Sequence, residues 1–184
     1  EHHSNLVVWQ HVCEKTGAKL VFLYPDENGR LRDNEMEEKI GPATKIVAIA
    51  HVSNVLGTIF PIERIVSRAH DMGAVVMLDC AQSAGHRPLD MKRLGVDFAA
   101  FSGHKMYAPM GIGVLYARTD LLESMPPYMF GGEMIDAVHE RHSTFEPGPK
   151  RFEAGTPNVA GAIGLAAAID YLTRIGFDEI ESIE

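Results

Sequence analysis

The sequence predicts an α/β fold with a mainly parallel sheet flanked by helices. Short β-branched apolar runs alternate with helical patterns along the chain, which is typical of parallel α/β units. Several of these runs are apolar throughout, as expected of strands that are covered on both faces. With 184 residues and 46% hydrophobic content, the chain is long enough for one domain with a substantial core. We therefore expect one α/β domain over residues 1–184.

Five apolar runs predict strands, and four segments with helical spacing lie between or beside them. The strands are expected from "KLVFLYP" (19–25), "KIVAIAHVS" (45–53), "AVVMLDC" (74–80), "DFAAFSG" (97–103) and "GVLYAR" (113–118). The helices are expected at 5–17, 33–41, 62–73 and 158–176, and each of them runs into a glycine, a common stop signal. Residues 126–157, rich in Gly, Pro, Glu and His, predict a long irregular loop that carries function or a partner interface.

Composition and charge exclude several classes of protein. A net charge of −8 argues against a nucleic-acid or anionic-membrane surface, and no apolar run approaches the roughly 20 residues of a membrane span. Two cysteines without CxxC spacing predict neither a disulfide framework nor a metal site, and favour a reducing, cytoplasmic setting. The chain starts at Glu1 without a Met and stops in an acidic helical pattern, so we expect a piece of a longer protein.

Polar clusters close three neighbouring strands of the predicted sheet. Ligands of doubly wound sheets gather at the carboxyl ends of strands, where these clusters are expected to meet. Any one of these residues alone is more commonly a helix cap or a loop residue, and the coincidence of three clusters favours a site. The clusters "HVSN", "DCAQ" and "SGHK" contribute His51, Asn54, Asp79, Gln82, Ser102, His104 and Lys105.

Lys105 is either a solvated surface cation or a nucleophile placed among groups that bind an anion. A nucleophilic lysine forms a Schiff base with an aldehyde, and the aldehyde cofactor that needs protein-supplied electronics is pyridoxal 5'-phosphate. That cofactor needs a carboxylate at its pyridine nitrogen, for which Asp79 is the candidate. Ser102 and His104 are placed to hold the phosphate, and Gln82 to hydrogen-bond the ring hydroxyl.

The first residues, "EHHSN", offer one further candidate. His2 provides an aromatic plate that could stack on the cofactor ring. A pair of histidines near a terminus is by itself more commonly a solvated surface feature, so His2 is a hypothesis that depends on the rest of the site.

Taken together, five segments resemble the group II, or Suf-type, cysteine desulfurases, also called selenocysteine lyases, of the class V aminotransferase superfamily. The segments are "EHHSNLVVWQ", "HVSNVLGT", "LDCAQSAGHRPLD", "DFAAFSGHKMYAPMGIGVLY" and "RFEAGTPNVAGAIGLAAAIDYL". The likeness covers nearly the whole chain in the right order. It implies the large domain of a fold-type I pyridoxal-phosphate enzyme, here incomplete, with the small C-terminal domain absent.

The resemblance also implies a role for each candidate residue. Lys105 falls on the Schiff-base lysine of the family. Asp79 and Gln82 fall on the residues that engage the pyridine nitrogen and the ring oxygen. Ser102 and His104 fall on residues that bind the phosphate, and His2 falls on the residue that stacks on the ring and aids proton transfer. Asn54 falls on a residue beside the ring and the substrate carboxylate. Thr156 is a weaker candidate, for contact with the neighbouring subunit's cofactor.

The chain departs from the family pattern in two kinds of feature. Cys80 and Ala108 stand where the family usually or often has glycine, and both changes exchange one small residue for another. The phosphate loop with its threonine, the nucleophilic cysteine and the substrate-binding arginine have no counterpart. We expect Cys13 and Cys80 to be small buried hydrophobes instead.

The activity implied is transfer of sulfur from L-cysteine, or selenium from L-selenocysteine, leaving L-alanine. Sulfur would pass through an enzyme persulfide to a carrier protein for iron–sulfur cluster assembly, in a homodimer. The 184 residues alone are expected to be inactive. The alternatives are another class V enzyme, such as a kynureninase-like, epimerase-like or plain aminotransferase protein, and a non-catalytic folded module.

Overall fold

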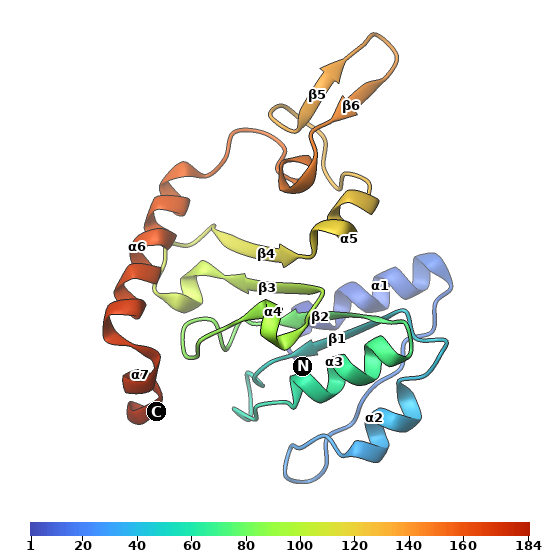
Figure 1. The fold of residues 1–184 in the computed structure, drawn as a ribbon, viewed down its shortest axis with the longest axis vertical. Helices are drawn as coiled ribbons and strands as arrows, with labels where there is room; N and C mark the ends of the chain where they lie inside the picture. The colour runs from blue at the N-terminus through green and yellow to red at the C-terminus, as the bar shows by residue number, and fades with distance from the viewer.

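The computed structural model describes residues 1–184 as a four-stranded sheet with surrounding helices and a separate two-stranded hairpin (Figure 1). The strands β1 (Ile46–Ala50), β2 (Val75–Asp79) and β3 (Phe98–Ser102) run parallel to one another. The fourth, β4 (Gly113–Ala117), pairs antiparallel with β3. The predicted mainly parallel sheet is therefore confirmed, with the spatial order β1-β2-β3-β4.

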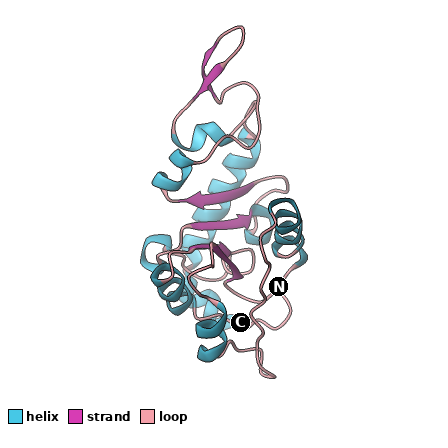
Figure 2. Ribbon diagram, turned by 90° about the vertical axis from the view of Figure 1, so that its right-hand side faces the viewer, coloured by secondary structure: helices cyan, strands magenta, loops and turns pink.

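Helices lie on both sides of the sheet (Figure 2). Four helices confirm the predicted segments to within a few residues. They are α1 (Val7–Thr16), α2 (Asp33–Lys39), α3 (Ile62–Asp71) and α6 (Val159–Ile175). The other helices are α4 (Met91–Leu94), α5 (Thr119–Ser124) and α7 (Phe177–Ile183), with 3-10 turns η1 (His3–Asn5), η2 (Gly103–Met106) and η3 (Gly148–Phe152).

The main core lies between α3 and the parallel strands. Apolar residues of α3 recur every three or four positions, so that Ile62, Ile65 and Ala69 face the sheet and are almost completely buried. They pack with Val76 and Leu78 of β2, which are fully buried. Burial of this kind stabilises the fold by roughly 1.5–3 kcal/mol for each large side chain, and it fixes the strands whose ends carry the polar clusters.

A smaller core joins η2 to α6. Met106, from the turn that follows β3, packs with Leu165 and Leu172 of α6. The helix begins at the Asn158 cap, whose side chain accepts a hydrogen bond from the backbone N–H of Gly161. No single helix is long and apolar enough to cross a membrane, although α6 and α7 taken together across their 75° bend meet the length and composition required.

The predicted strand at 19–25 is wrong, since the structure places no strand there. Side chains of α2 satisfy its backbone instead of a neighbouring strand. The Tyr24 N–H donates to Glu35 Oε1 at 2.7 Å, and Lys39 Nζ donates to the carbonyl oxygen of Phe22 at 2.7 Å. These bonds hold the segment against a helix, which the apolar pattern alone could not reveal.

The predicted irregular loop at 126–157 contains a hairpin that the sequence pattern did not indicate. The strands β5 (Ile135–Val138) and β6 (Ser143–Phe145) pair antiparallel and project away from the rest of the molecule (Figures 1 and 2). Both strands are short and only partly buried. They therefore lack the long apolar alternation by which a strand is recognised.

Candidate active site

The strand register brings the predicted clusters to one edge of the sheet. Ala50 pairs with Asp79, and Asp79 pairs with Ala100, so these residues form one row across β1, β2 and β3. The strands β1 and β2 end at that row, whereas β3 continues to Ser102. Backbone hydrogen bonds also connect the residues that follow β1 and β2. The N–H of His51 donates to the carbonyl oxygen of Asp79 at 2.9 Å, and that of Cys80 to Ala100 at 2.8 Å. The expected convergence of the strand ends is thus present in the structure.

Asp79 ends β2 with one carboxylate oxygen engaged. Its Oδ1 accepts a hydrogen bond from the Ala81 N–H at 2.9 Å, which fixes the carboxylate relative to the following turn. No donor of the chain reaches Oδ2. In that turn Gln82 is half-buried, and its side-chain amide forms no hydrogen bond within the chain. Both side chains are therefore held by a rigid backbone while keeping polar atoms available.

Lys105 lies in η2, the tight turn between β3 and β4. The Ala108 N–H donates to the carbonyl oxygen of Gly103 at 3.0 Å and closes the turn. Tyr107, which ends it, adopts a left-handed conformation with φ of 66°. The Lys105 side chain is half-buried and forms no ion pair or hydrogen bond within the chain. Burial without a carboxylate partner is not the usual setting of a surface lysine.

Ser102 and His104 flank the same turn. Ser102 is the last residue of β3, where it pairs with Gly113 of β4, and it is half-buried. His104 is exposed. Neither side chain has a hydrogen-bond partner in the chain, so the hydroxyl and the imidazole remain free beside Lys105. The structure thus groups three of the predicted residues on one turn.

His2 is held at the same edge by its neighbours. The Glu1 carboxylate accepts a hydrogen bond from the Ala50 N–H at 3.0 Å, which ties the first residues to the end of β1. The His2 Nδ1 atom caps η1 by accepting from the Ser4 N–H at 3.2 Å, and it lies 2.7 Å from the Ser4 hydroxyl. Because a backbone N–H can only donate, neutral His2 carries its proton on Nε2. Sequence reasoning missed Glu1, whose signal is its position beside the histidine pair.

Asn54 and Thr156 are both exposed and lie in less constrained segments. Asn54 is in a turn after β1 that the Ser53 hydroxyl organises by accepting from the backbone N–H groups of Val55 and Leu56. Thr156 leads into α6, and the Asn158 side chain donates to the Gly111 carbonyl oxygen at 3.0 Å. This bond brings the segment to the connection that follows η2. No hydrogen bond joins Asn54 or Thr156 to the other predicted residues.

His51 has a different character from the other members of the cluster. It is 9% exposed, and its Nδ1 is buried without a hydrogen-bond partner. Burial is the main cause that lowers the pKa of His51, and the nearby Arg87 lowers it further. A buried imidazole with a lowered pKa stays neutral near pH 7. His51 is therefore part of the packing under the site.

The two cysteines differ in environment. Cys80 is fully buried, as predicted, and burial raises the pKa of its thiol to about 12. Cys13 lies on α1 and is only half-buried, so its prediction as a buried residue is wrong. Its helix exposes several apolar residues, which the helical pattern alone did not predict. Because a nucleophilic sulfur must be accessible and deprotonated, Cys80 cannot fill that role.

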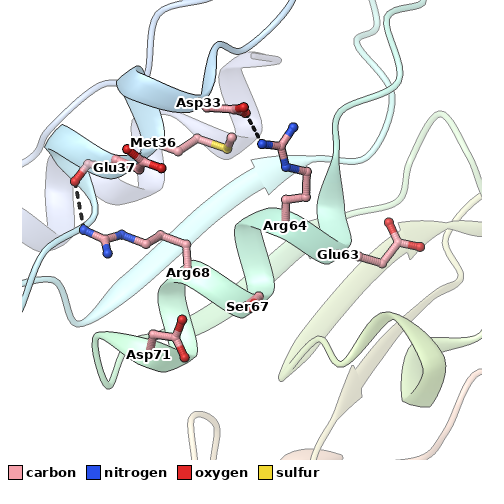
Figure 3. Close-up of a pocket in the computed structure, with 8 residues that line it drawn as sticks. All are labelled: Asp33, Met36, Glu37, Glu63, Arg64, Ser67, Arg68 and Asp71. Carbon is pink, nitrogen blue, oxygen red and sulfur yellow. Dashed lines mark hydrogen bonds and ion pairs between the residues drawn. The ribbon is translucent and has the colours of Figure 1, made fainter.

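One hollow of the structure lies away from these residues. A hollow of about 640 Å³ separates α2 from α3 and is lined mainly by charged residues (Figure 3). Its arginines are already engaged within the chain. Arg64 forms an ion pair with Asp33, and Arg68 donates to the backbone carbonyl oxygens of Glu37 and Ile40. The carboxyl edge of the sheet is the better candidate because its polar atoms are open.

The side chains at this edge fit pyridoxal phosphate by their chemistry. Asp79 offers an open carboxylate oxygen for a protonated ring nitrogen, and Lys105 offers an amine for an aldehyde. Gln82 offers an amide for a ring oxygen, while Ser102 and His104 offer donors suited to a phosphate. All of these belong to three connected strand ends and the turns that follow them.

Comparison with known proteins gives a consistent family. The model of the aminotransferase class-V family matches residues 1–184. A probable cysteine desulfurase of Halalkalibacterium halodurans is 54% identical over 184 residues, covering 100% of this chain and 45% of that protein. The one from Streptomyces coelicolor is 53% identical over 180 residues, covering 98% of this chain and 43% of that protein. The chain thus spans less than half the length of these relatives.

A solved structure agrees in fold. The cysteine desulfurase CsdA from Escherichia coli, in an S-sulfonic acid form, superposes with a TM-score of 0.94 at 46% identity. The match covers 99% of this chain and 46% of that one. Since the family model matches every residue and the fold agrees, the chain belongs to the class V aminotransferase family.

Proposed function

We propose that these residues form the cofactor-binding core of a pyridoxal-phosphate-dependent cysteine desulfurase. The observation that carries this proposal is the meeting of the Asp79 carboxylate and the Lys105 turn at one edge of the sheet, with polar atoms of both left open. The 54% identity to a probable cysteine desulfurase supports L-cysteine as the substrate. The net reaction converts L-cysteine and a thiol into L-alanine and a persulfide.

When bound, pyridoxal phosphate supplies an aldehyde that joins an amine and a ring that takes up negative charge from the neighbouring carbon. Lys105 Nζ would be the amine that holds the cofactor, and it would be placed to move a proton beside it. Asp79 Oδ2 would keep a proton on the ring nitrogen through a charge-assisted hydrogen bond. Gln82 would donate its amide N–H to the ring oxygen.

The remaining residues orient and bind. Ser102 and His104 would hold the phosphate beside the turn that carries Lys105. His2 would stack on the ring and present its Nε2 proton, since its Nδ1 accepts from Ser4. Asn54 would contact the ring and the substrate carboxylate, and Thr156 would reach the cofactor of a neighbouring subunit. These four roles stay predictions that rest on the family resemblance.

The thiol that accepts sulfur lies outside residues 1–184 in this proposal. Cys80 is fully buried with a raised pKa, and Cys13 lies on a helix rather than beside Lys105. We therefore propose that residues 1–184 are part of the large domain, and that a small C-terminal domain supplies the nucleophilic cysteine. Use of selenocysteine, a sulfur-carrier protein, iron–sulfur cluster assembly and a cytoplasmic location stay predictions.

Exposed apolar side chains beside the Lys105 turn support the expectation of a homodimer. Tyr107 is 70% exposed, Met110 84% and, on α6, Ile163 67%. Apolar patches of this kind usually mark a contact with another chain. The symmetric dimer is the commonest arrangement of such contacts.

The proposal is tested with the full-length protein loaded with pyridoxal phosphate. Reduction with borohydride, followed by peptide mapping, should place the pyridoxyl group on Lys105, and the protein should form equal amounts of alanine and sulfane sulfur from L-cysteine. Labelling of a different lysine would remove Lys105 from its role. Turnover of kynurenine instead of cysteine would favour the kynureninase-like alternative, and a protein that takes up no cofactor would favour the non-catalytic module.

A further inference from the structure

Gly85 lies where two functional segments touch through their backbones. It is buried in the turn that follows β2, and a Cβ placed on it would be 3.0 Å from the carbonyl oxygen of Lys105. The same Cβ would be 3.1 Å from Cα of Met106. These separations are shorter than ordinary van der Waals contact, so any side chain larger than hydrogen would displace one of the two segments.

The backbone conformation of Gly85 does not itself require glycine. Its φ lies outside the left-handed region that Gly17, Gly73 and Gly95 adopt, so an alanine could take the same dihedral angles. The requirement for glycine at position 85 is therefore one of space. That space is set by Lys105 and the residue after it.

Each of the two segments is stiff, so a contact between them fixes their relative position. On one side, the backbone N–H groups of Ser83 and Ala84 both donate to the carbonyl oxygen of Cys80, directly after Asp79. On the other side, η2 is closed by its own hydrogen bond and packs on α6 through Met106. A shift at the contact therefore moves whole turns and not only one side chain.

We propose that Gly85 is a positioning residue that sets the separation between the ring-binding pair, Asp79 and Gln82, and Lys105. The inference rests on the proposed function, because it concerns the two ends of one bound cofactor. The absence of a side chain at position 85 lets the turn after β2 and η2 approach closely enough for both to reach that cofactor. A misplacement of about 1 Å can lower the rate of an enzyme about 100-fold, so a smaller displacement of the two turns should have a smaller but measurable effect.

Gly85→Ala in the full-length holoenzyme tests the inference, with Gly41→Ala as the matched control. A Cβ at Gly41 meets nothing within 4 Å, and its φ is also not left-handed. We expect Gly85→Ala to retain the fold and its covalent link to the cofactor, to lower kcat about tenfold, and to leave KM within about twofold. The pH midpoint of the visible cofactor band should shift, whereas Gly41→Ala should match the wild type in both respects.

A second variant covers the case in which Gly85→Ala does not fold. Gly103→Ala crowds η2 from its other side, where a Cβ would be 2.8 Å from Cγ2 of Ile112 and 3.0 Å from its carbonyl oxygen. It should shift the same midpoint if the position of η2 is what matters. A normal midpoint and normal kcat in whichever of these variants folds would overturn the inference.

The wild-type protein separates this inference from the proposed function. If borohydride fails to fix the cofactor on Lys105 in the wild type, the proposed function is wrong and the role of Gly85 falls with it. If the wild type is labelled and active but Gly85→Ala behaves as Gly41→Ala does, only the role of Gly85 is wrong.

Discussion

At the amino edge of the sheet the carboxylate of Asp97 is fully engaged, whereas at the carboxyl edge that of Asp79 keeps one oxygen open. Asp97 is completely buried and accepts from the Val76 N–H at 2.7 Å, from His70 at 2.9 Å and from Arg118 at 2.9 Å. Asp79 accepts a single bond, from Ala81. The same residue type, placed before one strand and at the end of another, has all its hydrogen-bond partners within the chain in one case only.

This contrast separates polar groups that stabilise the fold from polar groups that await a ligand. The buried Asp97 carboxylate ties α3 and β2 to Arg118, the residue after β4, and removing it leaves these groups unpaired. Open polar atoms at the end of a strand cost stability or gain nothing until something binds them. Substitution at the carboxyl edge should therefore lower activity, whereas substitution at the amino edge should lower the free energy of unfolding.

The largest effect is expected from Lys105→Ala at the carboxyl edge. Loss of the amine removes the covalent attachment of the cofactor, so turnover of L-cysteine should fall at least about 1,000-fold. Because Lys105 forms no bond within the chain, the urea midpoint of the cofactor-free protein should hardly change. Lys92→Ala, on the short helix α4, is the control and should keep full activity. A large loss of stability in Lys105→Ala would contradict the contrast between the two edges.

Asp79→Asn should have the next largest effect. An amide cannot hold the ring proton as a carboxylate does, so kcat should fall about 100-fold or more while the fold remains. The Ala81 N–H keeps an acceptor, because Asn retains one side-chain oxygen. Steady-state kinetics with L-cysteine and circular dichroism of the same preparation give the two readings. Unchanged turnover would exclude Asp79 from the role proposed for it.

Asp97→Asn should show the opposite pattern. The substitution leaves at least one of the three donors around Asp97 without an acceptor, at a cost of about 2 kcal/mol in the free energy of unfolding. His70 and Arg118 are partly exposed and regain some water, which limits the loss. Urea titration of the cofactor-free protein measures the change. Activity of the folded fraction should remain near that of the wild type, and a selective loss of kcat would argue that the amino edge also serves the reaction.

The sequence was sufficient for the sheet and for the grouping of the site residues. Apolar β-branched runs place β1, β2 and β3 and thereby put Asp79 and Lys105 after neighbouring strands, because parallel strands share a carboxyl edge. The sequence pattern wrongly predicted a strand at 19–25, where the backbone of an apolar run forms hydrogen bonds with the Glu35 and Lys39 side chains of α2. Partners of that kind are far apart in the sequence and leave no periodic signal.

The hydrogen bonds and close contacts of the site could not be predicted from the sequence either. Which oxygen of Asp79 is open depends on a turn hydrogen bond, and the closeness of Gly85 to Lys105 depends on how two turns pack. Asp97 directly precedes β3, whereas Asp79 is the last residue of β2. Only the three-dimensional arrangement of donors distinguishes the structural carboxylate of Asp97 from that of Asp79, which is proposed to bind the cofactor.

The smallest expected effect concerns Cys80, which lies at the carboxyl edge but behaves like the residues of the amino edge. Burial raises its pKa from 9.0 to about 12, so between these pH values the folded protein keeps a proton that the unfolded chain has lost. Below pH 9 the Cys80 thiol therefore does not lower the free energy of unfolding. Above pH 9 the free energy of unfolding falls as the pH rises, by up to about 1.4 kcal/mol per pH unit. Cys80→Ala removes this contribution.

The measurement is the free energy of unfolding of the full-length protein at pH 8 and pH 10, compared between variants. The wild type should lose about 1 kcal/mol more than Cys80→Ala over this interval, because other groups titrate equally in both. The difference between the two pH values is the quantity to compare, since loss of the sulfur also weakens packing at every pH. Cys13→Ala, which alters a half-buried thiol on α1, should keep the wild-type slope. If the free energy of unfolding changed equally with pH in the wild type and in Cys80→Ala, the Cys80 thiol would be open to water or to a base. Cys80 would then resemble the open polar groups of the carboxyl edge.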